Sequence, residues 1–467
     1  MQSKTNIFFT LLAALFVLCA LPACENKNND STPSSETKLT GIVFAKNDSF
    51  PDLKNATFTI DLSPDTALVY NEDSLAVGTR IDSVVATFYF TTTIGYALFV
   101  SDSDTTLITA ADTLNFVPRP CHLHVVSQDM QNTRDYNIFV NVHTVDPDLY
   151  VWTQTQDKLF QGNRDVHAET LGDEVLLFTQ DGLAAQLYTS ADNGRTWNGP
   201  ATPAGLPKTA NIRQIIASPS RLYYAQDNHL YASTDGRTWS DTPLAPLSSM
   251  NPGTLLFYYN DSIWAIAEEI ASGNLWFLTM PEGGTFSKQT QIGPLDASRF
   301  PVSDFSAIAF TGVTGRRRAM ILGGYDKEGT MLNSRWNLEW VDTDSYDGLG
   351  LYRIEDFSIE HPDFPPIAGA AVTYYDNRLL LFTNPDNASP ELGKVVAGQK
   401  GLYESLDEGM NWTTPDSAAN VLPDEISPRN YSAVVVTPDQ AVLLIGGRDN
   451  TTSYADVWRA RKNAINW

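Results

Sequence analysis

Hydrophobic and polar residues follow three different patterns along the 467-residue chain. An unbroken apolar run extends from Ile7 to Ala20, and a polar stretch rich in Ser, Asn and acidic residues follows from Glu25 to Lys38. Beyond Lys38, apolar residues recur at alternate positions in short segments that are separated by turn-forming residues. Such alternation predicts β-strands with one buried face. We therefore expect an all-β protein behind an export segment and a flexible tether.

The end of the apolar run indicates export and lipid attachment. The run follows Lys4 and is too short to cross a bilayer as a helix, as in a cleaved signal peptide. Leu21-Pro22-Ala23-Cys24 resembles the lipobox of bacterial lipoproteins, although Pro22 departs from the usual pattern. The resemblance implies a signal peptide over 1–23, a lipid anchor on Cys24, a tether over 24–38 and retention at the outer membrane, on either of its faces. The alternative is an ordinary secretory peptide with an incidental cysteine.

Residues 39–145 have the pattern of a small β-sandwich. Short β-branched and aromatic runs, such as Ser83 to Phe90 and His122 to Val126, are separated by turn signals. The segment from Asn132 to Val142 resembles the last strand of Ig-like modules that are common in Bacteroidetes surface proteins. We therefore expect an Ig-like domain that ends where Val145-Asp146-Pro147-Asp148 breaks the pattern.

From Leu149 to Trp467 a short motif recurs whose residue types suit a tight hairpin. Its members are Ser190, Asp192, Gly194 and Trp197; Ser233, Asp235, Gly236 and Trp239; and Ser405, Asp407, Gly409 and Trp412. Glycine supplies a positive-φ position, the Asp and Ser side chains accept from turn amides, and Trp packs back against the strands. The motif resembles the Asp-box, S-x-D-x-G-x-T-W. Its first two copies are separated by the length of one four-stranded propeller blade.

Two further segments have a second repeat signature. Each has a Gly-Gly pair after an apolar strand and a later Trp: Gly323, Gly324 and Trp336, then Gly446, Gly447 and Trp458. Both resemble kelch repeats, in which the glycines let the chain turn and Trp fills the space between blades. Together the repeats predict a β-propeller over 149–467. We expect six blades, or seven if Thr343 to Pro365 is structured, with Val151 to Gln154 completing the first blade and fastening the ring.

The combination of lipobox, Ig-like domain and mixed kelch and Asp-box propeller resembles a group of Bacteroidetes lipoproteins of unknown function. The resemblance covers nearly all of the chain after Lys38. Its motifs specify architecture and not activity, because propellers serve both as enzymes and as scaffolds.

Charge and cysteine content narrow the possible partners. The chain has 31 basic and 55 acidic residues and a formal net charge of −24. Because such a surface repels phosphate backbones, we expect no nucleic-acid partner. If Cys24 is lipidated after cleavage, Cys121 is left as a free thiol and no intramolecular disulfide can form.

Asp-boxes also occur in sialidases, which suggests a hydrolase hypothesis. That family uses an arginine triad, a Tyr nucleophile with a Glu partner and an acidic proton donor, and its first arginine lies in an Arg-Ile-Pro segment. Upstream of Ser190 this chain offers Arg164, which is not in an Arg-Ile-Pro segment, and Tyr352-Arg353-Ile354-Glu355 lacks the proline. Arg213, Arg221 and Arg335 are further arginines whose convergence the sequence does not predict. We therefore assign no catalytic residue.

Four clusters could bind ions, and each has a simpler interpretation. On a strand, His122 and His124 share one face while Cys121 lies on the other, and a zinc site lacks a further ligand. Arg316-Arg317-Arg318 is expected to be a solvated turn in preference to an anion clamp. The acidic pairs at Asp102 and Asp104 and at Asp326 and Glu328 lack the full calcium ligand set. We therefore predict no metal ligand and no cofactor.

The sequence favours a non-enzymatic binding lipoprotein, anchored at the outer membrane, whose propeller face holds a glycan or a protein. The alternative is a carbohydrate-active hydrolase of unrecognised type. It would show paired carboxylates or convergent arginines at the propeller mouth. A third possibility is a structural accessory of an envelope complex, with a plugged mouth and one apolar flank.

Overall fold

The computed structural model of the protein describes residues 32–463 except 64–65, 103, 147–148, 244–248, 297–298, 344–345, 355–363, 385–400 and 415–421. The predicted signal peptide, Cys24 and the first part of the tether lie outside the described residues, as does most of the stretch after Ile354 that we considered for a seventh blade. Within the described part, regular structure consists of strands and two short 3-10 helices, which confirms the all-β prediction. None of the described helices is long and apolar enough to span a bilayer.

The chain divides into two compact units, 1–146 and 147–467. Unit 1 has a three-stranded and a six-stranded sheet, in the orders β1-β4-β7 and β2-β3-β9-β8-β5-β6. β3 and β9 pair in parallel, and all other pairs are antiparallel. The strands are β1 (Leu39–Phe44), β2 (Thr59–Asp61), β3 (Ala67–Tyr70), β4 (Val84–Phe90), β5 (Ile94–Ser101), β6 (Asp104–Leu107), β7 (Ala111–Leu114), β8 (Cys121–Ser127) and β9 (Thr133–Phe139), with the 3-10 helix η1 (Pro51–Asn55) after β1.

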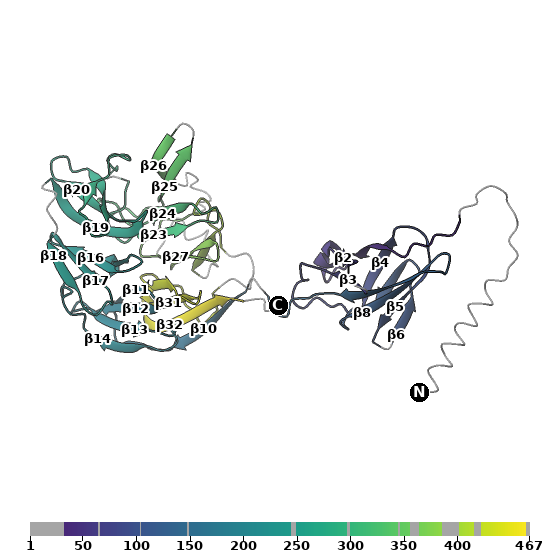
Figure 1. Ribbon diagram of the computed structural model, residues 1–467. Coiled ribbons are helices and arrows are strands. Elements are labelled where there is room, and N and C mark those ends of the chain that lie inside the picture. Colours follow the sequence, from purple (N-terminus) through teal and green to yellow (C-terminus); the bar gives the residue numbers. More distant parts are fainter. Residues whose placement is uncertain are drawn as a thin grey trace. The chain divides into compact units, whose positions relative to one another are not determined.

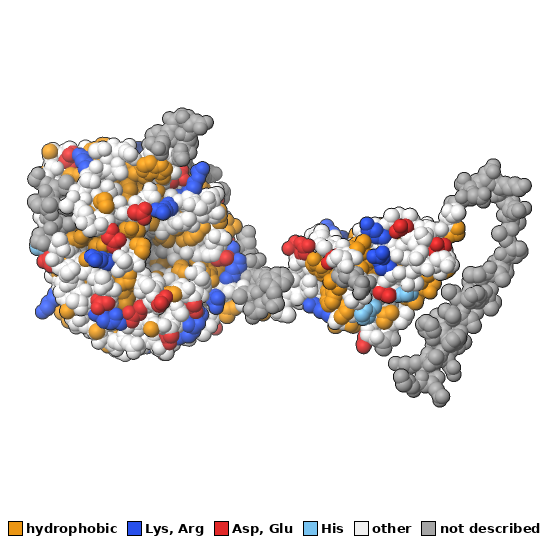
Figure 2. Space-filling view, in the orientation of Figure 1, with side chains coloured by type: hydrophobic (Ala, Val, Ile, Leu, Met, Phe, Trp, Pro, Cys, Tyr) orange, Lys and Arg blue, Asp and Glu red, His pale blue; other side chains and the backbone are white. Residues whose placement is uncertain are grey.

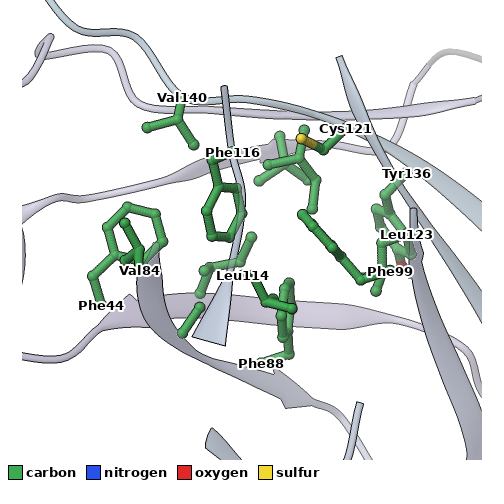
Figure 3. Close-up of a cluster of buried hydrophobic side chains, with 14 of the residues drawn as sticks. Phe44, Val84, Phe88, Phe99, Leu114, Phe116, Cys121, Leu123, Tyr136 and Val140 are labelled. Carbon is green, nitrogen blue, oxygen red and sulfur yellow. The ribbon is translucent and has the colours of Figure 1, made fainter. Parts of the chain in front are cut away.

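One hydrophobic core joins the two sheets of unit 1 (Figure 3). Phe116 lies between Phe44 of β1 and Phe99 of β5, with ring centroids 5.1 and 5.0 Å away. Tyr136 of β9 reaches across this core: its hydroxyl accepts from the Leu39 amide at 2.8 Å and donates to a backbone carbonyl. The strands therefore form two layers that bury a shared interior, as their alternating pattern predicts.

Unit 2 consists, among the described residues, of six separate antiparallel sheets (Figure 1). Five are built from consecutive strands and the sixth has the order β10-β32-β31-β30. The strands are β10 (Tyr150–Gln156); β11 (Asp165–Leu171), β12 (Glu174–Gln180), β13 (Gln186–Ser190) and β14 (Asn198–Ala201); β15 (Ile216–Ala217), β16 (Leu222–Gln226), β17 (His229–Ser233) and β18 (Ser240–Pro243); β19 (Met250–Tyr259), β20 (Ser262–Glu269), β21 (Leu275–Pro281) and β22 (Ser287–Lys288); β23 (Ser306–Thr311), β24 (Arg317–Leu322), β25 (Arg335–Thr343) and β26 (Tyr346–Ile354); β27 (Ala371–Tyr375), β28 (Arg378–Phe382) and β29 (Leu402–Ser405); and β30 (Ala433–Val436), β31 (Val442–Arg448) and β32 (Ser453–Lys462).

The first strands of the sheets contact one another in a closed order: β11, β15, β19, β23, β27, β30 and again β11. Such radial repetition of small sheets around an axis is a β-propeller, as the repeats predict.

The prediction for Val151 to Gln154 was wrong in one respect. This segment belongs to β10, which pairs with β32 and completes the last sheet instead of the first. The ring is fastened because strands from the two ends of the unit share one sheet.

Large apolar side chains fill the spaces between neighbouring sheets. One cluster combines Leu176 and Phe178 of β12 with Tyr224 and Trp239 of the following sheet. Trp336, Trp412 and Trp458 are equally buried in such clusters. These tryptophans therefore hold sheet against sheet and do not form a ligand surface.

Candidate functional site

The first strands of the six sheets line a central channel of about 440 Å³. The face of unit 2 drawn in Figure 2 is hollowed near its middle, with basic and acidic side chains on the surrounding surface. Within the channel, His167 Nε2 of β11 lies 3.1 Å from Glu169 Oε1 on the same strand. Most other lining residues are apolar or aromatic, including Tyr258, Phe305 and Tyr374, whereas Arg213, Thr373 and two serines add polar groups. The channel thus combines polar and aromatic walls, as small-ligand sites do.

A second hollow, of about 410 Å³, lies where the first strands begin and includes Arg213 and Asp304. Arg213 lies in the 3-10 helix η2 (Ile212–Gln214), whose first turn is fixed because Asn211 Oδ1 accepts from the Arg213 amide. Its Nη1 lies 3.5 Å from Asp304 Oδ1, and its guanidinium carbon lies 4.4 Å from the centroid of the Tyr431 ring. We call this end of the channel the mouth.

Tyr431 is held at the mouth by unusual backbone geometry. Its φ is +58°, and its amide donates to the Gly369 carbonyl at 2.6 Å. Gly369 is required there because a Cβ would lie 2.6 Å from Tyr431 Cε1. A second arginine, Arg448, places its guanidinium carbon 4.2 Å from the Tyr431 centroid and donates to Asp165 Oδ1 at 3.0 Å. We refer to Arg213, Tyr431 and Arg448, with Asp304 and Asp165, as the mouth cluster.

The mouth cluster brings two cations close together in a partly buried place. Burial lowers the pKa of Arg213, and Arg448 acts in the same direction, against the opposing charges of Asp304 and Asp165. Burial also raises the pKa of Tyr431, and Asp304 adds to this effect. The Tyr431 ring therefore stays neutral at physiological pH and offers its π-face to both guanidinium groups.

Sequence reasoning named only Arg213 among these residues, and without a role. Asp304 and Tyr431 directly precede β23 and β30, and Arg448 ends β31, so all three lie at the mouth end of their sheets. The residues before Tyr431 gave no signal of this position, because Arg429 and Asn430 are 2% and 1% exposed and bond inside the fold instead of facing the mouth.

The predicted Asp-box residues lie at the other end of the channel. Adjacent strands are antiparallel, so the turns after the third strands are at the opposite end from the mouth. Ser190 Oγ donates to Asp192 Oδ1 at 2.8 Å and accepts from the Gly194 amide, while Asp192 accepts from the Thr196 amide. The same bonds recur in the turns of Ser233, Asp235 and Gly236 and of Ser405, Asp407 and Gly409. These residues build turns and do not contribute to the mouth.

The predicted kelch glycines end second strands on the mouth side. Gly323 and Gly324 have φ of +57° and +87°, and Gly446 and Gly447 have +57° and +98°. Their tryptophans, Trp336 and Trp458, lie on the third strands and are 7% exposed. The glycines thus shape the mouth without offering a side chain to it.

The other arginines of the sialidase hypothesis are not brought together with Arg213. Arg221 is in the turn after β15, at the opposite end, whereas Arg335 begins β25 and is 1% exposed. Arg164 pairs with Asp181 at 2.9 Å, and Arg353 lies over Trp336. The described residues therefore offer no arginine triad around a common point.

Two of the predicted ion-binding clusters have local roles, and one prediction about them was wrong. Arg318 is not in a solvated turn: it lies 3.0 Å from Glu339 and 2.9 Å from Glu408 and is 16% exposed. It was mispredicted because β24 carries this residue against the next sheet. Asp326 Oδ1 accepts from two backbone amides of its own turn.

The Cys-His segment begins β8, where its side chains have partners of their own. His124 Nδ1 lies 2.6 Å from Asp135 Oδ1 on the neighbouring strand. Cys121 is buried in the core, where its Sγ lies 3.2 Å from the Pro118 carbonyl oxygen and 3.5 Å from that of Asn115, and burial raises the pKa of its thiol. In the described part of the chain, no three His, Cys, Asp or Glu side chains are grouped so that they could hold a metal ion.

Comparison with known families covers both units. Residues 146–467 match a family model described as "DUF6242 beta propeller domain". Residues 26–140 match one described as "Domain of unknown function (DUF6242) N-terminal domain". No curated protein matches the chain.

Several solved structures share a distant likeness. A thermostable family-43 glycoside hydrolase is 12% identical, with a TM-score of 0.31 over 66% of this chain and 90% of its own. An endo-arabinase from Bacteroides thetaiotaomicron VPI-5482 is 9% identical, with a TM-score of 0.30 over 67% of this chain and 98% of its own. A chain from a RAG complex with melted and unmelted RSS is 11% identical, with a TM-score of 0.40 over 66% and 97%. Likenesses this distant carry no information about activity.

Proposed function

The chain belongs to the DUF6242 family of unknown function, and we propose that its propeller is a non-enzymatic carbohydrate-binding domain whose ligand occupies the channel mouth. The observation that carries the proposal is the mouth cluster. Two arginines contact the ring of Tyr431, and one of them, Arg213, lines a hollow of about 410 Å³ together with Asp304.

This arrangement suits a sugar for physical reasons. Sugar rings present hydroxyl groups that donate and accept, and the mouth offers guanidinium donors beside carboxylate acceptors. Sugar rings also have apolar faces, for which Phe305 in the wall of the hollow provides an aromatic partner. The volume of the hollow lies within the range of small-ligand pockets, about 300–1,000 Å³. A protein partner that docks on a rim needs no such hollow.

The surrounding architecture fits a capture role at the cell surface. We infer that the propeller has six blades of kelch and Asp-box type, and that unit 1 is an Ig-like spacer. We further infer that a lipid on Cys24 anchors the protein in the outer membrane. Support comes from the six sheets of the described residues, the recurring turn bonds and the lipobox-like segment. Mass spectrometry of the protein from its native host would test the lipid directly.

The test is a glycan array probed with purified protein of residues 25–467, with calcium and with a chelator, followed by calorimetry on each hit. Arg213→Gln removes mouth donors and is expected to weaken binding at least tenfold, about 1.4 kcal/mol. Arg221→Gln, at the opposite end of the ring, is the matched control and should bind as the parent does. Thermal unfolding of both variants shows whether each is folded.

Two results would contradict the proposal. Absence of binding to any glycan would leave a protein ligand as the better hypothesis, and binding that Arg213→Gln leaves unchanged would place the site elsewhere. The hydrolase alternative also predicts convergent arginines at the mouth, so chromatography of the bound oligosaccharide after long incubation tests it directly. Shortened products would overturn the non-enzymatic part of the proposal.

A further inference from the structure

Arg213 and Arg448 share a single aromatic platform. Their guanidinium carbons lie 4.4 and 4.2 Å from the centroid of the Tyr431 ring, although the two residues come from η2 and the end of β31. Two positive charges near one ring repel each other, since Arg448 lowers the pKa of Arg213, and partial burial strengthens the repulsion because less water screens it. An anion bound beside them would offset this cost.

Each of these arginines is held by a carboxylate at only one point. Arg213 reaches Asp304 through Nη1 at 3.5 Å, the outer limit of a hydrogen bond, and Arg448 reaches Asp165 through Nη1 at 3.0 Å. A guanidinium group has five N–H donors arranged as a fork. These contacts therefore fix the two side chains and leave further donor edges available at the mouth.

A fully engaged arginine in the same protein looks different. Arg237 binds Glu174 through two nitrogens and two oxygens, at 2.6 and 3.0 Å, in the two-point geometry that arginine and carboxylate prefer. Arg237 lies in an Asp-box turn away from the mouth, where no hollow is needed. Arg164 and Arg195 also reach a carboxylate through a single nitrogen. What sets the two mouth arginines apart is therefore that they share one aromatic ring.

We propose that the ligand of the mouth is an acidic glycan, and that Arg213 and Arg448 bind a carboxylate on its sugar ring while Tyr431 supports both guanidinium groups. The inference rests on the proposed function. A uronic acid has the required chemistry, since its planar carboxylate fits the guanidinium fork. The chain has a net charge of −24, so its overall field does not attract anions. Recognition must then come from these local donors.

The decisive test compares two ligands on the unaltered protein. Calorimetry with oligogalacturonate and with its methyl ester, which has the same rings but no charge, should give at least tenfold tighter binding of the acid. Dextran sulfate serves as a general polyanion. If it binds as tightly as oligogalacturonate does, the proposed selectivity for a carboxylate is overturned. Other uronate oligomers, such as alginate and hyaluronan fragments, show whether ring type matters.

Variants then test which arginines bind the carboxylate of the ligand. Arg448→Gln and Arg213→Gln should each weaken binding of the acid at least tenfold and abolish the preference over the ester, whereas Arg221→Gln should do neither. Arg448→Lys keeps the charge but loses the fork and should fall between. If acid and ester bind equally, the carboxylate proposal fails while carbohydrate binding stands. If no glycan binds at all, the proposed function itself fails.

Discussion

Arg237 and Glu174 form a two-point ion pair that joins two neighbouring propeller sheets, with contacts of 2.6 and 3.0 Å. Arg237 lies in the Asp-box turn after β17, and Glu174 begins β12 of the preceding sheet. The first Asp-box turn makes an equivalent contact: Arg195 lies 3.0 Å from Asp439, in the turn before β31 of its own preceding sheet. The Asp-box turns thus connect each sheet to the first hairpin of the sheet before it.

The same connection occurs where other residues replace the arginine. In the third Asp-box turn Glu408 contacts Arg318 of β24, with the charges reversed. The turn after β21 has no Asp-box, yet its Glu282 accepts hydrogen bonds from Tyr223 and two serines of the preceding sheet. Position in the ring, and not the motif alone, therefore determines this contact.

Glu174→Gln should destabilise the propeller by about 0.5–1 kcal/mol at pH 7, since the ion pair is partly exposed. The hydrogen bond from Arg237 holds the pKa of Glu174 below its usual value of 4.5. The contribution of this charge is therefore fully present above pH 4.5 and is lost as the pH falls below it through the folded-state pKa. Denaturant midpoints at pH 7, 5 and 3 should show the difference between parent and variant narrowing at pH 3.

Exposed Glu425 offers the control, because Glu425→Gln should leave the midpoint unchanged at each pH. A difference for Glu174→Gln that persists unchanged at pH 3 would assign its effect to packing instead of charge.

Much of the fold could be predicted because its signals are local. Gly446-Gly447 and the Asp-box serines act within one turn, so their residue types alone indicate the turn geometry. The partner of β10 could not be predicted, because pairing with β32 depends on where the ring closes and not on the strand's own sequence. Likewise the sequence alone places Arg318 in a charged turn, because its partner Glu408 comes from the neighbouring sheet.

The mouth cluster was beyond prediction for a related reason. Arg213, Asp304 and Tyr431 come from three sheets that are far apart in sequence, and each is unremarkable within its own segment. Their proximity follows only from the order of sheets around the ring. Even the position of the Tyr431 ring depends on Gly369 of another sheet, whose missing Cβ makes room for it.

The three Asp-box tryptophans differ in one hydrogen bond, which gives a matched comparison. Trp239 Nε1 donates to the Gly236 carbonyl at 2.9 Å and Trp412 Nε1 to the Gly409 carbonyl at 3.1 Å, but the buried Nε1 of Trp197 has no acceptor. Trp→Phe should cost about 1 kcal/mol more at 239 and 412 than at 197, where an unsatisfied donor is removed. Denaturant unfolding of the three variants measures this, and equal losses would show that the indole bonds contribute nothing.

Two glycines, Gly315 in the turn before β24 and the kelch glycine Gly447, allow backbone strain to be separated from steric crowding. Gly315 has φ of +76° and nothing within 4 Å of an added Cβ, so Gly315→Ala should cost about 1–2 kcal/mol from backbone conformation alone. Gly447 has φ of +98°, and an added Cβ would lie 2.9 Å from the Asn430 carbonyl oxygen and collide with Ser432 Oγ. Gly447→Ala should therefore cost about 3 kcal/mol or more.

Ser432→Ala tests the origin of that larger loss. This change removes the colliding oxygen. The double variant with Gly447→Ala should therefore lose at least about 0.5 kcal/mol less unfolding free energy than the two single losses added together. Additive losses would instead assign the damage to the Asn430 carbonyl and the backbone.

Because Ser432 lines the channel, the crowding in Gly447→Ala should also reach the mouth. Its glycan affinity, measured well below its unfolding temperature, should fall and should recover in part in the double variant.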